Sequence, residues 1–267
     1  MSSFAVIKKH KQLLIFPVLS GASLLLLFAS YLAILLLPND GNFSAVIAER
    51  DIVTYIGLFV FYLINYFIVV FFNMGLIHCA RIYFQGGVPK VSDGLNFSLS
   101  RVGDILAWSA MAATVGLILR LLEEKLGKIG QIIAALAGVA WSITTFFVVP
   151  VLAYENLTPI AAFKRSAQIM KEKWGESLGS SFSFGIVQIL GILLIGLPLF
   201  FLGSLIGLIP SIVLAGIGVL FVIAVTSAGQ TIFISAVYHR INDNDVQDFD
   251  GDLLDSAFIH KEKKGLF

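Results

Sequence analysis

The side chains that could do chemistry in this hydrophobic chain are mainly neutral and polar, and they lie inside long apolar runs. Asn65 and Asn73 are eight residues apart, about two helical turns, so a helix carries both on one face. They either line a pore or substrate path, or they hydrogen-bond to neighbouring helices, and we prefer the second interpretation. The complete set of candidate path-lining or interhelical residues is Asn65, Asn73, Gln188, Gln230, Thr144 and Thr145.

Aspartate, glutamate, lysine and arginine are absent from the middle of every apolar run. Charges at the centre of a bilayer are costly, and where they occur they mark proton relays, voltage sensors and ion pathways. Their absence argues against those classes of protein. The sequence also has no Walker loop, no H-E-x-x-H or G-x-S-x-G motif and no dinucleotide-binding fingerprint. We therefore expect a protein that is not an enzyme and that has neither catalytic residues nor a cofactor.

Two histidines, His78 and His239, close two of the apolar runs at corresponding ends. Such a pair could bind a metal or titrate near neutral pH, but no further ligands are suitably spaced, so we expect no metal site. Six aspartates follow the last apolar run, within residues 242–255. Their order does not match a calcium-binding loop, because Ala257 stands where that loop requires glutamate. We interpret this segment as a solvated acidic linker.

The composition requires a membrane setting. Of 267 residues, 58% are hydrophobic and 13% are charged, whereas soluble domains carry about 25% charged residues. The apolar runs are continuous rather than alternating, which favours helices over a β-barrel, and the net charge of +1 gives no nucleic-acid footprint. We predict about six transmembrane helices, each long enough for about 30 Å of hydrocarbon. The predicted spans are 13–37, 51–79, 105–121, 129–149, 178–202 and 209–238.

The basic residues predict how these spans are oriented. Fourteen lysines and arginines fall on the side of the membrane that holds both termini, against four on the other side. The positive-inside rule therefore predicts cytoplasmic termini. We divide the chain into a six-span domain, 1–240, and a tail, 241–267, made of the acidic linker and a short amphipathic segment.

The cytoplasmic segments are expected to form amphipathic helices at the membrane interface. Thr158 and Pro159 begin one such helix, with threonine as the cap and proline in the first helical position. Its residues expected to contact lipid are Lys164, Arg165, Lys171 and Trp174. A similar helix precedes each pair of spans, which indicates three pseudo-repeated hairpins. The alternative is the simple alternation found in any hairpin membrane protein.

Residues 141–155 read W-S-I-T-T-F-F-V-V-P-V-L-A-Y-E. This segment resembles the signature of a family of bacterial and archaeal six-span membrane proteins of unknown function. The basic helix that ends in Lys173-Trp174-Gly175 and the C-terminal L-L-D-S-A-F at 253–258 are similar to that family as well. The resemblance implies the topology and a prokaryotic inner (cytoplasmic) membrane. It supplies no catalytic residue.

From these observations we expect an all-α, multi-pass protein whose partners are membrane lipids and further copies of itself. Short outer loops, little catalytic equipment and a glycine-rich last hairpin favour a non-enzymatic, homo-oligomeric channel or permease-like component. The alternative is a structural or lipid-organising protein that acts through its cytoplasmic amphipathic helices. The glycines of the last hairpin, including Gly203 and Gly207, either permit tight packing between subunits or a bending gate, or reflect the general frequency of glycine in membrane helices.

Overall fold

The computed structural model describes residues 3–36 and 52–241, apart from the side chains of Leu35 and residues 172–183. Within these ranges the chain is mostly helical and forms no strand, as the composition predicts. Five helical stretches are long and apolar enough to cross a membrane: Lys11–Ile34, Ile52–Phe84, Val102–Tyr154, Phe184–Ser204 and Leu208–Ile241. Most of the predicted tail, 241–267, lies outside the described residues.

The chain divides into two compact units, which are described separately below. Unit 1 consists of Met1–Val18, Leu76–Gly94 and Gln168–Phe267. Unit 2 consists of Leu19–Gly75 and Leu95–Ala167.

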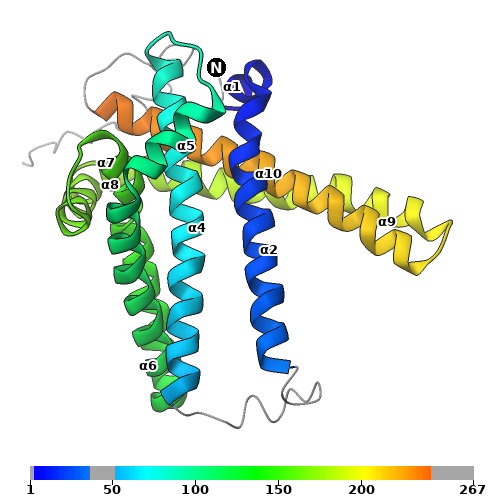
Figure 1. Ribbon diagram of the computed structural model, residues 1–267, viewed down its shortest axis with the longest axis horizontal. Coiled ribbons are helices and arrows are strands. Elements are labelled where there is room, and N and C mark those ends of the chain that lie inside the picture. Colours follow the sequence, from blue (N-terminus) through cyan, green and yellow to red (C-terminus); the bar gives the residue numbers. More distant parts are fainter. Residues whose placement is uncertain (1–2, 37–51, 242–267) are drawn as a thin grey trace, which may run out of the picture. The chain divides into compact units, whose positions relative to one another are not determined.

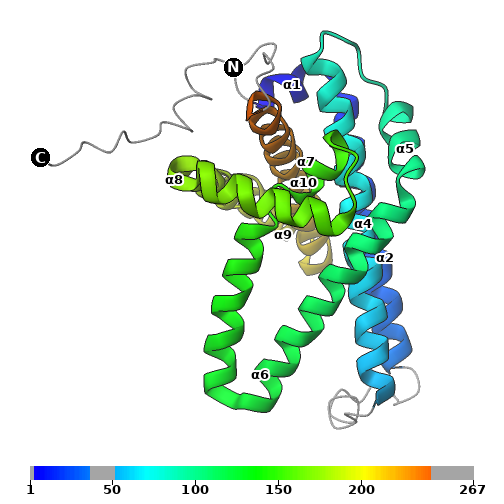
Figure 2. The same cartoon turned by 90° about the vertical axis from the view of Figure 1, so that its left-hand side faces the viewer.

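Unit 2 is built around a helix that reverses its direction. Its elements are most of α2 (Ile15–Leu36) and α4 (Ile52–Phe84), most of α5 (Val91–Ser100), α6 (Val102–Thr144), α7 (Val148–Tyr154) and the start of α8 (Pro159–Gly191). Figure 2 shows α6 as two arms that meet at a turn. The turn is at Gly127, whose φ of 56° and ψ of −134° suit glycine and leave the helical region.

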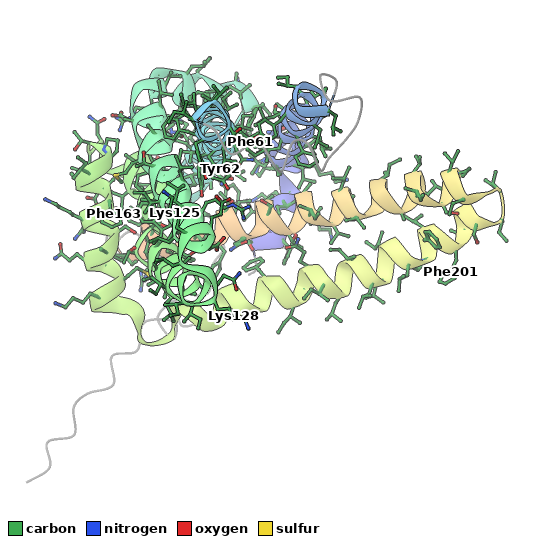
Figure 3. The ribbon with its side chains drawn as sticks, turned by 90° about the horizontal axis from the view of Figure 1, so that it is seen from below. Phe61, Tyr62, Lys125, Lys128, Phe163 and Phe201 are labelled. Atoms are coloured by element: carbon green, nitrogen blue, oxygen red, sulfur yellow. The ribbon has the colours of Figure 1, made fainter. Side chains whose placement is uncertain are left out.

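The ring contacts of α6 confirm the reversal. Trp108 and Trp141 stack with their ring centroids 5.8 Å apart, whereas in a straight helix they would be separated by about 50 Å. The predicted span 105–121 falls on the first arm of α6, whereas 129–149 starts on the second arm and runs past the end of α6 at Thr144 into α7. Lys125 and Lys128 lie at the turn (Figure 3).

A polar network ties the turn end of α6 to α4. Arg120 donates from Nε to Glu124 Oε1 at 2.8 Å. The hydroxyl of Tyr55 on α4 donates to the other carboxylate oxygen of Glu124 at 3.2 Å. Both carboxylate oxygens of Glu124 thus have hydrogen-bond partners, at the point in α6 where the apolar run ends and charged residues begin.

Unit 1 contains the start of the chain and its last helical hairpin. Its elements are α1 (Ser3–Lys9), the 3-10 turn η1 (Lys11–Leu14), the end of α4, most of α8, the π turn η3 (Ile192–Gly196), α9 (Leu197–Ser204) and α10 (Leu208–Ile241). Helix α8 runs without a break from the predicted amphipathic segment into the predicted span 178–202. The π turn precedes Pro198, which has no N–H to donate to the carbonyl four residues earlier, and the widened turn accommodates this loss.

Glycines let α9 and the π turn pack closely on α10, and Figure 1 shows α9 and α10 side by side. A Cβ atom at Gly196 would meet Val219 at 3.1 Å. One at Gly203 would collide with the backbone of Ser211, across the turn between the two helices. The outer surface of the pair is apolar: Phe201 on α9 (Figure 3) is 66% exposed. Gly196 and Gly203 therefore permit close packing within the hairpin itself.

Candidate functional site

The six neutral polar candidates fall into both units. Asn65 and Asn73 are half-buried on α4 in unit 2, eight residues apart on one helix. Gln188 and Gln230 are half-buried on α8 and α10 in unit 1. No single unit contains all six, so the structure does not assemble them into one path within either unit.

The two threonines of the set bond to their own helix. Thr144 Oγ1 donates to the carbonyl of Ala140 at 2.9 Å, and Thr145 Oγ1 donates to the carbonyl of Trp141 at 2.7 Å. Such bonds satisfy hydroxyls in an apolar setting without a neighbouring helix. The positions of Thr144 and Thr145 at the end of α6 are therefore explained by local backbone bonding.

Ser166 of α8 bridges the break between α6 and α7. Its hydroxyl donates to the carbonyl of Thr144 at 2.7 Å and accepts the backbone N–H of Phe147 at 3.0 Å. The side chain is fully buried. Backbone groups at helix ends need hydrogen-bond partners, and Ser166 is the partner of one carbonyl and one N–H where α6 ends. Sequence reasoning missed this residue, because its role depends on α8 packing against the break.

The segment that carries the family resemblance is a packing element. Trp141 is stacked between Trp108, at 5.8 Å and an interplanar angle of 7°, and Phe163 of α8, at 5.5 Å and 24°. Val148, Val151 and Leu152 are fully buried. Their environment is the protein interior, so these motif residues hold α6, α7 and α8 together and present no reactive group.

Two arginines contact the end of α7 and the residue that follows it. Arg101 donates from Nη2 to the carbonyl of Leu152 at 3.1 Å and pairs through Nε with Asp104 at 3.0 Å. Arg165 pairs with Glu155, which follows α7, at 3.2 Å. Arg165, one of the predicted lipid-contacting residues, is thus engaged in an ion pair within unit 2.

Helix α8 has a buried face and an exposed face. Apolar residues of the helix are used for packing: Phe163 (Figure 3) stacks on Trp141, and Ala162 and Met170 are buried. The exposed stripe, defined here as the α8 stripe, follows helical spacing and consists of Ile160, Lys164, Gln168 and Lys171. The side chain of Trp174 lies outside the described residues.

The second polar region lies in unit 1, where the start of the chain meets the ends of α4 and α10. Lys9 donates from Nζ to the hydroxyl of Tyr83 at 3.4 Å, and the ring of His10 packs edge-on against Tyr83 at 5.2 Å. Burial, and then the charge of Lys9, lower the pKa of His10 below its ordinary value of 6.5. His239, one of the two histidines singled out from the sequence, is buried and packs against Phe84 at 5.7 Å.

His78, the other histidine of the pair, is half-buried near the end of α4. No group of three or more histidines, cysteines, aspartates or glutamates among the described residues could hold a metal ion. The region is thus a basic and aromatic cluster in its described part.

Comparison with known proteins places the chain in a family. No curated protein and no solved structure is significantly similar to it. One family model matches residues 52–247, which span α4 to α10 and include the motif at 141–155. The chain therefore belongs to a family of unknown function (DUF6159).

Proposed function

We propose that this chain is a non-enzymatic, multi-pass protein of the prokaryotic inner membrane that organises anionic lipids in the cytoplasmic leaflet. The observation that carries the proposal is the α8 stripe, in which Lys164 and Lys171 are exposed on the same helical face. Each lysine near an anionic leaflet contributes about 1 kcal/mol to lipid attraction. On the opposite side of the helix from Lys164, Ala162 and Ser166 are buried within unit 2.

In this proposal the chain crosses the membrane six times, because the two arms of α6, which meet at Gly127, are separate crossings. The arm from Val102 to the turn is about 37 Å long, which exceeds the hydrocarbon thickness of about 30 Å. Both termini are then cytoplasmic, in agreement with the bias of lysines and arginines. Three short cytoplasmic segments, α1, α5 and the start of α8, each precede a helical hairpin, which supports the repeated-hairpin arrangement.

Lipid enrichment around the reconstituted protein tests this function. The protein is placed in vesicles of phosphatidylcholine and phosphatidylglycerol, extracted with its surrounding lipids in polymer nanodiscs, and analysed by lipid mass spectrometry. The double substitution Lys164→Gln and Lys171→Gln should reduce phosphatidylglycerol enrichment, and high salt should weaken enrichment in the unmodified protein. The control is Lys125→Gln with Lys128→Gln, which removes the same charge at the α6 turn. Equal enrichment in all three proteins would refute the proposal.

A homo-oligomeric channel or permease-like component is the second candidate. It is favoured by the half-buried amides of Asn65 and Asn73 within an otherwise apolar helix. In this proposal several copies surround one path, since neither unit gathers all the polar candidates. Substituting both asparagines with leucine should change the conductance of protein incorporated into planar bilayers. Absence of current across a range of voltage, tension and pH would exclude this candidate.

A further inference from the structure

Three segments that are distant in the sequence form one surface in unit 1. The ring of Tyr83, near the end of α4, is buried beneath Lys9 and His10 from the start of the chain. The Lys9 ammonium lies 5.1 Å from the centroid of this ring, close enough for a cation–π interaction. The adjacent Phe84 contacts His239 near the end of α10. The aromatic pair at the end of α4 therefore holds both other segments.

Hydrogen bonds bring further lysines to the same surface. Gln12 donates from Nε2 to the carbonyl of Pro89 at 2.6 Å. This bond places Lys11, next to Gln12, near Lys90, next to Pro89, and both lysines are exposed. The thiol of Cys79 donates to the carbonyl of Lys90 at 3.3 Å, which fixes the backbone of this turn on α4.

The described charged residues of unit 1 are mainly basic. We define the cation cluster as four of them on these segments: Lys9, Lys11, Arg81 and Lys90. Asp93 is the one acidic residue among the described side chains of unit 1. Its carboxylate accepts the backbone N–H of Lys90 at 3.0 Å and so caps the start of α5. His10, His78 and His239 are the titratable groups beside the cluster, and their protonation would add to its positive charge.

The cluster lies at helix ends, where a membrane-spanning helix would meet lipid headgroups. It joins the ends of two helices long and apolar enough to span a membrane, Ile52–Phe84 and Leu208–Ile241. Exposed apolar side chains begin within two turns of Lys11, because Ile15 is 42% exposed and Val18 is 52% exposed. A ligand that matches this surface carries negative charge at one end and a hydrocarbon chain at the other.

We propose that the cation cluster binds the phosphate of an anionic phospholipid, with the acyl chains lying along the exposed apolar residues that follow Lys11. The inference rests on the proposed lipid function and gives it a specific binding site, separate from the α8 stripe. The lysines surround the headgroup from α1, η1 and the α4–α5 turn, and Arg81 contributes a planar group suited to phosphate. The adjoining apolar surface favours a lipid over free phosphate.

Lipid titration of the full-length protein tests the site. Detergent-solubilised protein is titrated with phosphatidylglycerol or phosphatidylcholine, and the bound lipids are counted by native mass spectrometry. The double substitution Lys9→Gln and Lys11→Gln should weaken binding of the tightest phosphatidylglycerol about 25-fold, at about fivefold per charge removed. Arg81→Gln should weaken it as well. The variant Lys9→Arg with Lys11→Arg should retain binding, which separates charge from folding.

Two comparisons give the result that would overturn the site. The control Lys125→Gln with Lys128→Gln should leave this tight lipid in place; an equal loss in the control would mean that net charge alone governs binding. Millimolar inorganic phosphate should not displace the lipid, and complete displacement would identify a free-anion site instead. Loss of enrichment in Lys164→Gln/Lys171→Gln, with normal tight binding in Lys9→Gln/Lys11→Gln, would refute this site while supporting the α8 proposal. The opposite pattern would refute the α8 proposal alone.

Discussion

Replacing Ser166 with alanine should destabilise the α6–α7 junction. The substitution removes one oxygen atom from a fully buried site and creates little space. It takes away the acceptor of the Phe147 N–H, at 3.0 Å, and the donor to the Thr144 carbonyl, at 2.7 Å. Each buried polar group that loses its partner costs about 1–3 kcal/mol. We expect the two losses together to lower the free energy of unfolding by about 2–4 kcal/mol, because the backbone relaxes in part.

Equilibrium unfolding by sodium dodecyl sulfate in mixed micelles measures this change. Tryptophan fluorescence is a suitable signal because Trp108 and Trp141 stack in the same unit. The matched control is Ser100→Ala. The exposed hydroxyl of Ser100 donates a hydrogen bond of 2.7 Å to the carbonyl of Phe97 in its own helix. That control should change stability by less than about 0.5 kcal/mol. If Ser166→Ala is no less stable than Ser100→Ala, the bridge does not hold the junction.

Three further predictions concern packing and pH. Gly203→Ala should destabilise the α9–α10 pair by about 1–3 kcal/mol in the same unfolding assay, because the new methyl group meets the backbone of Ser211. The control Gly216→Ala should not destabilise the pair, because its methyl group meets open space. Trp141→Ala should cost about 2–3 kcal/mol, less than the cost of about 3–5 for a fully buried tryptophan, and Trp141→Phe should recover part of the loss. Because the folded-state pKa of His10 is below 6.5, its contribution to the docking of α1 is complete above pH 6.5 and is lost as the pH falls through the folded pKa. The protection factors of the α1 amides, which correct for the slower intrinsic exchange in acid, should therefore fall as the pH is lowered in the unmodified protein, and His10→Gln should reduce that fall.

The helical membrane class could be predicted because it follows from local composition, but the ends of helices could not. The predicted span 51–79 stops near His78, where the hydropathy falls, whereas α4 continues to Phe84. The extra turn contains Tyr83 and Phe84, which are buried within unit 1. Hydropathy estimates contact with lipid, so it underestimates a helix whose last turn is covered by protein.

The prediction for α8 was limited by the same ambiguity. An apolar face on a basic helix fits insertion into the membrane interface and also fits packing against the protein. Phe163 stacks on Trp141 with ring centroids 5.5 Å apart, so this residue packs against the protein. The spacing of Lys164 and Lys171 did predict a common basic face, because it depends only on helical geometry.

The buried motif residues at 141–155 and the residues of the cation cluster are different parts of the chain, so membership of the family predicts the fold and the lipid site to different degrees. The motif at 141–155 is largely explained by burial, ring stacking and backbone partners, so a match to it predicts a fold more strongly than a chemical activity. The family match begins at residue 52, so it includes Arg81 and Lys90 but not Lys9 or Lys11. If the cation cluster binds a phospholipid as proposed, the matched region supplies one part of the site and the preceding α1–η1 segment supplies the other. Lipid preference can then change through substitutions near the start of the chain, without altering the packing that the motif maintains.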